Sequence, residues 1–150
     1  MLAIVLIGIP GSGKSTLSGQ IVEASSGNLL PLSLDHFRQV VNGDENDNSN
    51  FFKVKKAFNQ SLRNAKQDVI IDNTNCKTSY RKNICGQLKS LGYTDIVGLV
   101  VECTVEQSLR NQKNRERKVS REVVGRMYHN LSHYPPSLEE GFTSIHYIEG

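Results

Sequence analysis

The sequence predicts an α/β domain, a mostly parallel sheet of about five strands flanked by helices. Short apolar runs alternate with longer amphipathic runs along all 150 residues, as in chains whose parallel strands are joined by helices. The hydrophobic share of 37% and the charged share of 22% are those of a globular protein and exclude a disordered or fibrous chain. No internal repeat, low-complexity tract or linker divides the sequence, and its length suits one domain. We therefore expect a single domain over residues 1–150.

Each element is predicted from the spacing of its apolar residues. Continuous apolar runs between polar residues indicate buried strands, whereas apolar residues three and four positions apart indicate amphipathic helices. In chain order we expect a strand at 2–7, a helix at 14–24, a strand at 29–34, a helix at 35–41, a loop at 42–50, a helix at 51–66, a strand at 68–72, a helix at 79–91, a strand at 96–101, helices at 104–111 and 120–131, and a strand at 144–148.

In the first half of the chain, the run LAIVLI at residues 2–7 is the clearest buried strand. Pro31 lies inside the next apolar run and predicts an irregular or edge strand, because proline donates no hydrogen bond to a neighbouring strand. Residues 42–50 (NGDENDNSN) contain no apolar residue and predict a loop. The apolar residues of 51–66 recur at helical spacing.

In the second half, DVIID at residues 68–72 and IVGLVV at residues 96–101 are short apolar runs that predict the third and fourth strands. Thr104 is followed three residues later by Gln107, a capping-box pattern that marks the start of a helix. Ser120 is a candidate cap for the helix after it. These helices connect successive strands, so the strands are expected to be parallel.

The composition also excludes several classes of protein. The apolar run at residues 2–7 is far shorter than the roughly 20 residues of a membrane-spanning helix, and no basic segment precedes it, so we expect neither a membrane span nor a signal peptide. The cysteines Cys76, Cys85 and Cys103 have no CxxC spacing, which argues against a disulfide framework or a zinc site. We interpret them as small core residues of a cytoplasmic protein.

Residues 8–15 (GIPGSGKS) match the phosphate-loop pattern G-x-x-x-x-G-K-[ST] in full. The motif follows a predicted strand and opens a predicted helix, which is the context that its chemistry needs. Its glycines let the backbone turn tightly and direct N–H groups at anionic oxygens, and the helix adds its positive N-terminal end. The sequence therefore predicts a site for the phosphates of a nucleotide.

Two residues of the motif carry specific chemistry. Lys14 is expected to reach the β- and γ-phosphates and is a catalytic candidate, while the Ser15 hydroxyl is expected to ligate Mg²⁺. The expected cofactors are ATP or another NTP, together with Mg²⁺. The nucleotide-binding residues predicted here are Gly8, Ile9, Pro10, Gly11, Ser12, Gly13, Lys14, Ser15 and Thr16.

Polar residues follow the predicted strand at 68–72. Asp72 closes this strand, where P-loop enzymes place a second carboxylate on the metal side, so it is a candidate metal ligand with Ser15. The alternative is an ordinary cap of the following turn. Asn73 comes next, at the edge where parallel sheets bind ligands, and is a candidate substrate-binding residue.

Asp35 and Arg38 lie three residues apart, which puts both side chains on one face of the short helix predicted there. The carboxylate suits a general base that accepts the proton of an attacking hydroxyl, and the arginine suits a clamp on an anionic group of the acceptor. The alternative is that Asp35 caps the helix and Arg38 is solvated.

Two further features have alternative interpretations. Residues 110–126 hold seven basic residues against two glutamates in a chain of net charge +3; such a run is either a solvated helix face or a surface for phosphates. Phe51, Phe52 and Phe58 either stack on a nucleic-acid base or pack in the core, and their helical spacing favours the core.

Taken together, these motifs resemble the kinase domain of polynucleotide 5′-hydroxyl kinases, enzymes that heal nucleic-acid ends. The resemblance covers nearly the whole chain in the same order, and its later motifs are more specific than the phosphate loop. The motifs that carry it are Gly8–Ser15, Asp35-x-x-Arg38, Ile70–Asn75, Asn114–Arg117 and Pro136–Ile145.

The resemblance implies a P-loop kinase fold with an arginine-bearing lid at about residues 112–120. It implies ATP-dependent transfer of the γ-phosphoryl group to the 5′-hydroxyl end of DNA or RNA. Family members often carry a phosphatase domain with an Asp-x-Asp-x-Thr motif; that motif does not occur here, so 3′-phosphatase activity is not expected.

The resemblance also assigns roles to individual residues. Asp35 would be the general base, and Arg38 would clamp the acceptor's phosphate. Arg115, a further catalytic candidate, and its neighbour Arg117 would lie over the donor's β- and γ-phosphates. For Asp72 two roles stay open, a place in the metal shell or a brace for Arg38.

Two other functions are compatible with part of these motifs. A P-loop kinase for a small acceptor, such as a nucleoside, sugar or modified base, would share Lys14, Ser15 and Asp35 but would need no broad cationic approach. A non-catalytic NTP-binding switch protein would have no use for the acceptor residues Asp35 and Arg38.

Overall fold

The computed structural model describes residues 1–113 and 118–150. Its five strands form one parallel sheet in the order β2-β3-β1-β4-β5. No helix of the described residues combines the length and the apolar character needed to cross a membrane. The elements are β1 (Leu2–Ile7), α1 (Lys14–Ala24), β2 (Leu29–Leu32), α2 (Leu34–Asn42), α3 (Phe51–Asn64), β3 (Asp68–Asp72), α4 (Thr78–Ser90), β4 (Asp95–Glu102), α5 (Val105–Asn111), α6 (Arg121–His133), the 3₁₀ helix η1 (Leu138–Glu140) and β5 (Ser144–Glu149).

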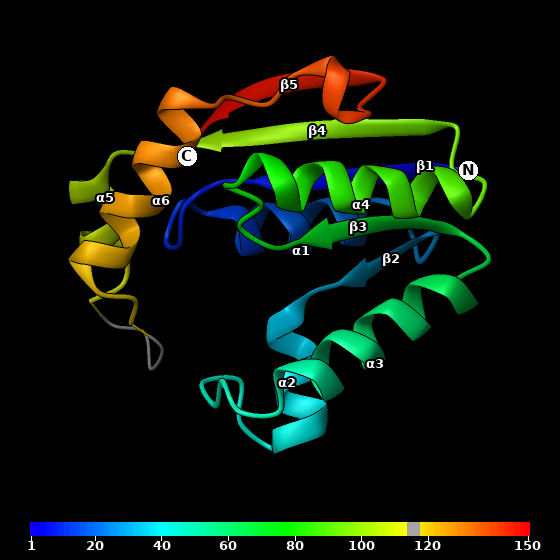
Figure 1. The fold of residues 1–150 in the computed structure, drawn as a ribbon, viewed down its shortest axis with the longest axis horizontal. Helices are drawn as coiled ribbons and strands as arrows, with labels where there is room; N and C mark the ends of the chain where they lie inside the picture. Colours follow the sequence, from blue (N-terminus) through cyan, green and yellow to red (C-terminus); the bar gives the residue numbers. More distant parts are fainter. Residues whose placement is uncertain (114–117) are drawn as a thin grey trace.

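The strand order places β1 at the centre of the sheet, between β3 and β4. The chain fills one side of β1 with β2 and β3 and then crosses to the other side for β4 and β5. All five carboxyl ends therefore meet at one edge, toward the left-hand side of Figure 1, where α5 and α6 also lie, and α2 follows the end of β2 at the lower centre. Parallel α/β sheets bind ligands at this edge, where the strand order reverses. The predicted α/β P-loop fold is confirmed.

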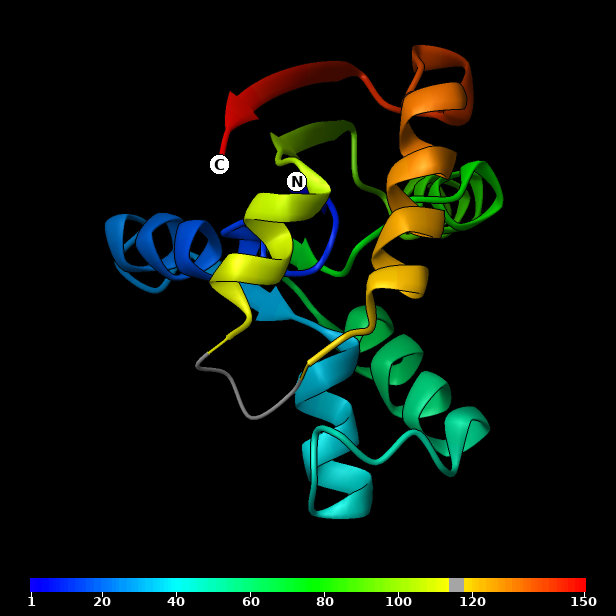
Figure 2. The same ribbon diagram turned by 90° about the vertical axis from the view of Figure 1, so that its left-hand side faces the viewer.

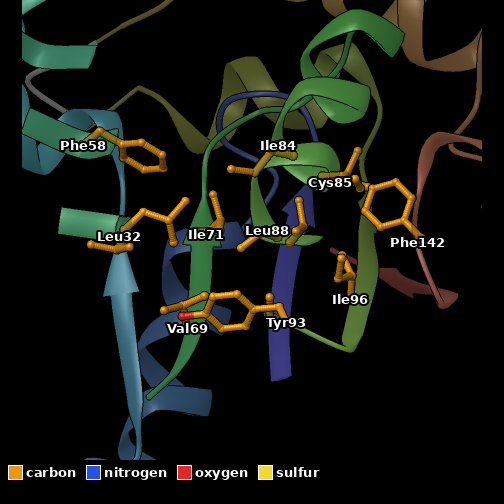
Figure 3. Close-up of a cluster of buried hydrophobic side chains, with 14 of the residues drawn as sticks. Leu32, Phe58, Val69, Ile71, Ile84, Cys85, Leu88, Tyr93, Ile96 and Phe142 are labelled. Atoms are coloured by element: carbon orange, nitrogen blue, oxygen red, sulfur yellow. The ribbon is translucent and has the colours of Figure 1, made fainter. Parts of the chain in front are cut away.

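Helices cover both faces of the sheet, as the edge-on view in Figure 2 shows. In β1, Ala3, Val5 and Ile7 point into the main core beneath α3 and α4, whereas Ile4 and Leu6 point toward α1. Figure 3 shows the main core, in which side chains of the strands interdigitate with those of α4. Because both of their faces are covered, the central strands β1 and β3 are continuously apolar in their interiors rather than alternating.

The second strand is shorter than predicted. It ends at Leu32 because the Ser33 Oγ accepts a hydrogen bond from the His36 N–H (3.1 Å) and so caps α2. The cap of α2 is thus Ser33 and not Asp35. Pro31 lies in β2 at the edge of the sheet, as its sequence predicted.

The prediction that three phenylalanines pack in the core is wrong for two of them. Helix α3 buries one stripe, Val54, Phe58 and Leu62. Phe51 and Phe52 precede that stripe and remain 56% and 88% exposed. Helical spacing shows which residues share a face, but it does not show where the covering elements end.

The cysteines follow the prediction only in part. Cys76 and Cys85 are buried, while Cys103 is partly exposed. Burial raises the pKa of the Cys76 thiol and of the Cys85 thiol to about 11. Both thiols are therefore protonated at neutral pH and are poor nucleophiles.

Candidate active site

A cavity of about 1100 Å³ opens at the carboxyl edge of the sheet. Its walls come from the phosphate loop, the first turn of α1, helix α2, the α2–α3 loop, the end of β3 and the segment between α5 and α6. Residues predicted from sequence that line it are Pro10, Gly11, Gly13, Lys14, Ser15, Thr16, Asp35, Arg38, Asp72 and Asn73. Three other predicted residues, Gly8, Ile9 and Ser12, lie inside the phosphate loop or beneath it.

Glycines of the phosphate loop sit where a side chain has no room. A Cβ on Gly11 would lie 2.7 Å from the Ser108 carbonyl oxygen, and the φ of Gly11 is +74°. A Cβ on Gly8 would lie 2.9 Å from the Val101 carbonyl oxygen. The loop therefore packs closely against α5 and the end of β4, which leaves no room for side chains at these two glycines.

Lys14 is buried at the start of α1 although its side chain carries a charge. The residue is 8% exposed, and its Nζ donates to the Ile9 carbonyl oxygen across 3.4 Å. The phosphate loop thus surrounds the ammonium group and holds it at the cavity wall. A buried cation in this position attracts anionic oxygens more strongly than an exposed one, because water screens it less.

Ser15 and Asp72 meet across the end of the sheet. The Ser15 Oγ donates to the Asp72 Oδ2 at 2.9 Å, because Asp72 pairs with Leu6 in the register that aligns β3 with β1. Hydroxyl and carboxylate oxygens are the ligands that Mg²⁺ prefers. In the described part of the chain, no group of three His, Cys, Asp or Glu side chains is placed to hold a metal ion, so this pair would hold Mg²⁺ only together with phosphate oxygens and water.

Asp35 and Arg38 form an ion pair on the first turns of α2, through Oδ1 and Nη2. The Arg38 side chain is 14% exposed and that of Asp35 is 42% exposed. The Arg38 Nε also donates to the Glu45 carbonyl oxygen at 3.0 Å, which ties the α2–α3 loop to the same group. The alternative of a solvated arginine is therefore wrong.

Asn73 connects the end of β3 to α2. Its Oδ1 accepts a hydrogen bond from the backbone N–H of Leu34 at 2.9 Å, one of the N–H groups that a helix start leaves unpaired. The predicted substrate-binding residue thus fixes the turn that carries Asp35. Through Asn73 the acceptor side of the cavity is attached to the sheet.

Polar side chains of α5 and the residue after it support the phosphate loop, and sequence analysis missed them. Asn111 Nδ2 donates to the Gly11 carbonyl oxygen at 2.7 Å. Gln112, only 3% exposed, donates to the Ser108 Oγ at 3.0 Å and accepts from the Val119 N–H at 2.8 Å. Gln112 therefore connects the end of α5 to Val119, the two described ends of the segment predicted as a lid. No motif marks these residues, because each acts through hydrogen bonds to other segments.

The predicted lid arginines, Arg115 and Arg117, lie outside the described residues. Lys118 follows them and lines the cavity, as do Val123 and Met127 of α6. Lys118, within the segment predicted as a lid, and these residues of α6 thus line the same cavity as the phosphate loop.

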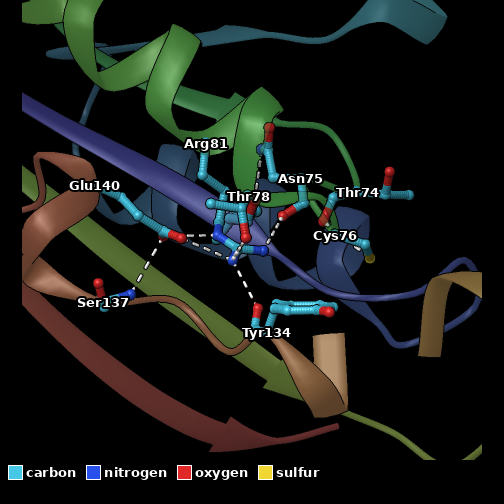
Figure 4. A network of polar contacts seen from close by, with 9 residues as sticks. Thr74, Asn75, Cys76, Thr78, Arg81, Tyr134, Ser137 and Glu140 are labelled. Carbon is cyan, nitrogen blue, oxygen red and sulfur yellow. Dashed lines mark hydrogen bonds and ion pairs between the residues drawn. The ribbon is translucent and has the colours of Figure 1, made fainter. Parts of the chain in front are cut away.

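A buried arginine on α4 joins three segments behind the site (Figure 4). Arg81 is completely buried and binds the Glu140 carboxylate through Nε at 2.7 Å and Nη2 at 2.9 Å. It also donates to the Asn75 carbonyl oxygen at 3.2 Å and to the Tyr134 carbonyl oxygen at 2.7 Å. The Arg81 guanidinium thereby connects the loop after β3, the end of α6 and the helix η1, which the sequence analysis did not predict.

We expect Arg81→Met to destabilise the protein strongly. The substitution leaves the Glu140 carboxylate buried without its partner, which costs about 3–5 kcal/mol of unfolding free energy. Urea denaturation followed by circular dichroism measures this loss. Lys82→Met, at the exposed neighbouring position, is the control and should change stability by less than about 0.5 kcal/mol. A loss below about 1 kcal/mol for Arg81→Met would show that this network is not structural.

The sheet order, the phosphate loop and the cavity beside it define the class of this protein: it has the fold of the P-loop kinases. More particularly, the chain belongs to the AAA_33 family, whose AAA domain model matches residues 4–133. No curated protein matches the sequence significantly.

Several solved structures share the fold. A chain of the Pnkp1/Rnl/Hen1 RNA repair complex is 21% identical, with a TM-score of 0.75 over 87% of this chain and 44% of that chain. A gluconokinase from Sinorhizobium meliloti 1021 is 16% identical (TM-score 0.63, 99% of this chain and 82% of that one). A shikimate kinase from Acinetobacter baumannii is 17% identical (TM-score 0.61, 97% and 83%). This chain thus spans less than half of the repair-complex chain.

Proposed function

We propose that this protein is an ATP-dependent polynucleotide kinase that transfers the γ-phosphoryl group to the 5′-hydroxyl end of DNA or RNA. The observation that carries the proposal is one cavity with two halves. Lys14 and Ser15 line the half that suits a nucleotide donor, and the Asp35–Arg38 pair lines the half that suits an acceptor. A nucleotide switch needs only the first half.

In the donor half, Lys14 neutralises the β- and γ-phosphate oxygens as charge moves during transfer. Ser15 and Asp72 would hold Mg²⁺, which supplies positive charge at the phosphate oxygens when bound. Arg115 and Arg117, assigned by the sequence resemblance, would add planar, bidentate contacts to the same phosphates. The protein performs little covalent chemistry and acts by positioning and charge neutralisation.

In the acceptor half, the 5′-oxygen forms a bond to the γ-phosphorus while the bond from that phosphorus to the bridging oxygen breaks and ADP leaves. Asp35 accepts the proton of the 5′-hydroxyl. Arg38 holds the phosphate that follows the first nucleoside. Asn73 keeps the first turn of α2, and so Asp35, in place.

The acceptor distinguishes this proposal from its alternatives, because kinases of small molecules share the fold. The likeness to the Pnkp1/Rnl/Hen1 RNA repair complex and the sequence motifs support a nucleic-acid acceptor. The test is incubation with ATP labelled on the γ-phosphate and a panel of acceptors: 5′-hydroxyl DNA and RNA oligonucleotides, nucleosides, sugars and no acceptor. Label transferred to oligonucleotide ends is the expected result. Label on nucleosides or sugars alone would replace the proposal with a small-acceptor kinase, and no transfer would leave a switch protein.

Arg38→Ala should separate acceptors that carry a phosphate from those that do not. We expect kcat/KM to fall about tenfold or more for a nucleoside 3′-phosphate and a short oligonucleotide, since the variant cannot form a hydrogen bond to a charged group. A plain nucleoside has no phosphate to hold and should be affected far less. Equal losses on all three acceptors would contradict the role of Arg38 as a phosphate clamp.

A further inference from the structure

Helix α3 begins with an aromatic pair that the proposed site does not use. Phe51 and Phe52 are 56% and 88% exposed, and their ring centroids lie 6.1 Å apart at an interplanar angle of 69°. Two adjacent exposed phenylalanines leave apolar surface in contact with water. A binding partner that buried this surface would gain free energy from its removal from water. A pair of this kind marks a candidate binding surface.

Beyond Phe52, the outward face of α3 carries basic residues. Residues 51–67 contain five basic and no acidic residues. Lys56 and Arg63 lie four and eleven positions after Phe52, so the three share one helical stripe, and all are exposed. The opposite stripe is buried, which directs this face toward solvent; Figure 3 shows one of its side chains, Phe58, in the core. We call Phe51, Phe52, Lys56 and Arg63 the α3 surface.

The α3 surface begins beside the acceptor half of the cavity. Asn46 and Asn48, in the loop before α3, line the cavity. The loop is held to α2, because the Asn42 Nδ2 donates to the Ser49 carbonyl oxygen at 2.9 Å. Phe51 is three residues beyond Asn48, so their Cα atoms are at most about 11 Å apart. In Figure 1, α3 runs from this loop away from the carboxyl edge of the sheet.

We propose that the α3 surface binds a single strand of nucleic acid, the nucleotides that follow the acceptor's 5′-hydroxyl end. Unpaired bases stack on exposed aromatic rings, and lysine and arginine bind the phosphates between them. A duplex keeps its bases stacked inside and presents no base face to Phe51 and Phe52. This inference rests on the proposed function, and it adds that the acceptor is unpaired beyond its first nucleotide.

Charges nearby favour a path along α3. The α2–α3 loop carries three carboxylates: those of Asp44 and Glu45 are exposed, and that of Asp47 is partly exposed. They repel phosphates from the tip of the loop. A nucleic-acid strand that leaves the cavity past this loop therefore meets positive charge where it runs along α3.

The test compares three double variants on three acceptors. Phe51→Ala/Phe52→Ala removes the aromatic pair, and Lys56→Glu/Arg63→Glu reverses the basic stripe. Lys82→Glu/Lys89→Glu on α4 is the control, with the same seven-residue spacing, the same charge change and exposed positions. The first acceptor is a nucleoside 3′-phosphate, which reaches the cavity but not the α3 surface. The second is a 5′-hydroxyl single strand of about 12 nucleotides, a length within the site sizes of single-strand binding folds. The third is a blunt duplex of the same sequence.

For the single strand, we expect the aromatic variant to raise KM about five- to 150-fold, the range for removing the stacking of one base. The charge variant should raise KM and flatten its salt dependence, by about 0.7 in the log–log slope for each phosphate that a basic side chain no longer binds. Neither variant should change kcat/KM for the nucleoside 3′-phosphate more than about twofold. The control variant should match wild type on all acceptors, and wild type should use the blunt duplex poorly.

Other outcomes overturn the inference without touching the proposed function. In one such outcome, wild type phosphorylates the oligonucleotide efficiently, and the two α3 variants have the same KM for it as wild type. Another is a wild-type dimer in sedimentation that Phe51→Ala/Phe52→Ala converts to a monomer, which would assign the surface to a second copy of the chain. A third is binding of the surface to anionic vesicles and not to the oligonucleotide. If wild type phosphorylates no nucleic acid, the proposed function fails; fluorescence anisotropy with the labelled single strand then tests the surface by itself.

Discussion

Lys14→Ala should reduce phosphoryl transfer at least a hundredfold. The ammonium group is buried and held by the phosphate loop, so its charge acts on the transferring group with little screening by water. One preorganised charge at such a position contributes about 3 kcal/mol or more to the transition state, which corresponds to a factor above 100 in rate. The measurement is kcat/KM with labelled ATP and the best acceptor of the panel.

A second variant separates the charge of Lys14 from its packing. Lys14→Met keeps most of the volume of the side chain but not its charge, and it should lose as much activity as Lys14→Ala. Lys82→Ala on the exposed face of α4 is the matched control and should retain wild-type rates. Circular dichroism checks that each variant is folded. Activity of Lys14→Met within tenfold of wild type would remove the phosphate loop from the mechanism.

Asp35→Asn should lower kcat by about 10²–10⁴ while KM for the acceptor changes little. The amide keeps the shape of the side chain but cannot accept the proton of the 5′-hydroxyl, and general-base catalysis contributes a factor of this size. His36→Ala, the exposed neighbour on the same helix, should stay within twofold of wild type. Steady-state kinetics on a saturating oligonucleotide measure both effects.

The ion pair between Asp35 and Arg38 gives this prediction a competing explanation, in which Asp35 only orients the guanidinium. A double-mutant cycle distinguishes the two. If Asp35 is the base, Asp35→Asn reduces kcat by a similar factor in the Arg38→Ala background. If Asp35 acts only through Arg38, the substitution has no further effect once Arg38 is absent, and the role of general base is excluded.

Much of the fold and of the candidate site was predictable because it depends on short stretches of sequence. The apolar run at residues 2–7, the glycine-rich motif at 8–15 and the helix after it form one strand–loop–helix unit whose geometry is local. The position of Asp72 beside the phosphate loop was also predictable from the sequence, since the carboxyl ends of parallel strands meet at one edge of the sheet. The hydrogen bond between Ser15 and Asp72 is consistent with that rule.

Only the tertiary structure decided which distant residues support the site. Asn73 binds the N–H of Leu34, 39 residues away, and Arg81 binds Glu140, 59 residues away. Each contact depends on how helices and loops pack on the sheet, and no periodicity or motif records that packing. Gln112 was missed for the same reason.

The phenylalanines of α3 show this division most clearly. By itself the sequence determined that Phe51, Phe52 and Phe58 belong to one helix, because apolar spacing reports helical geometry. The tertiary structure decided that Phe58 is buried and that the other two are exposed. Burial depends on which neighbouring elements reach each turn of a helix, and those neighbours come from parts of the chain that the spacing of one segment cannot describe.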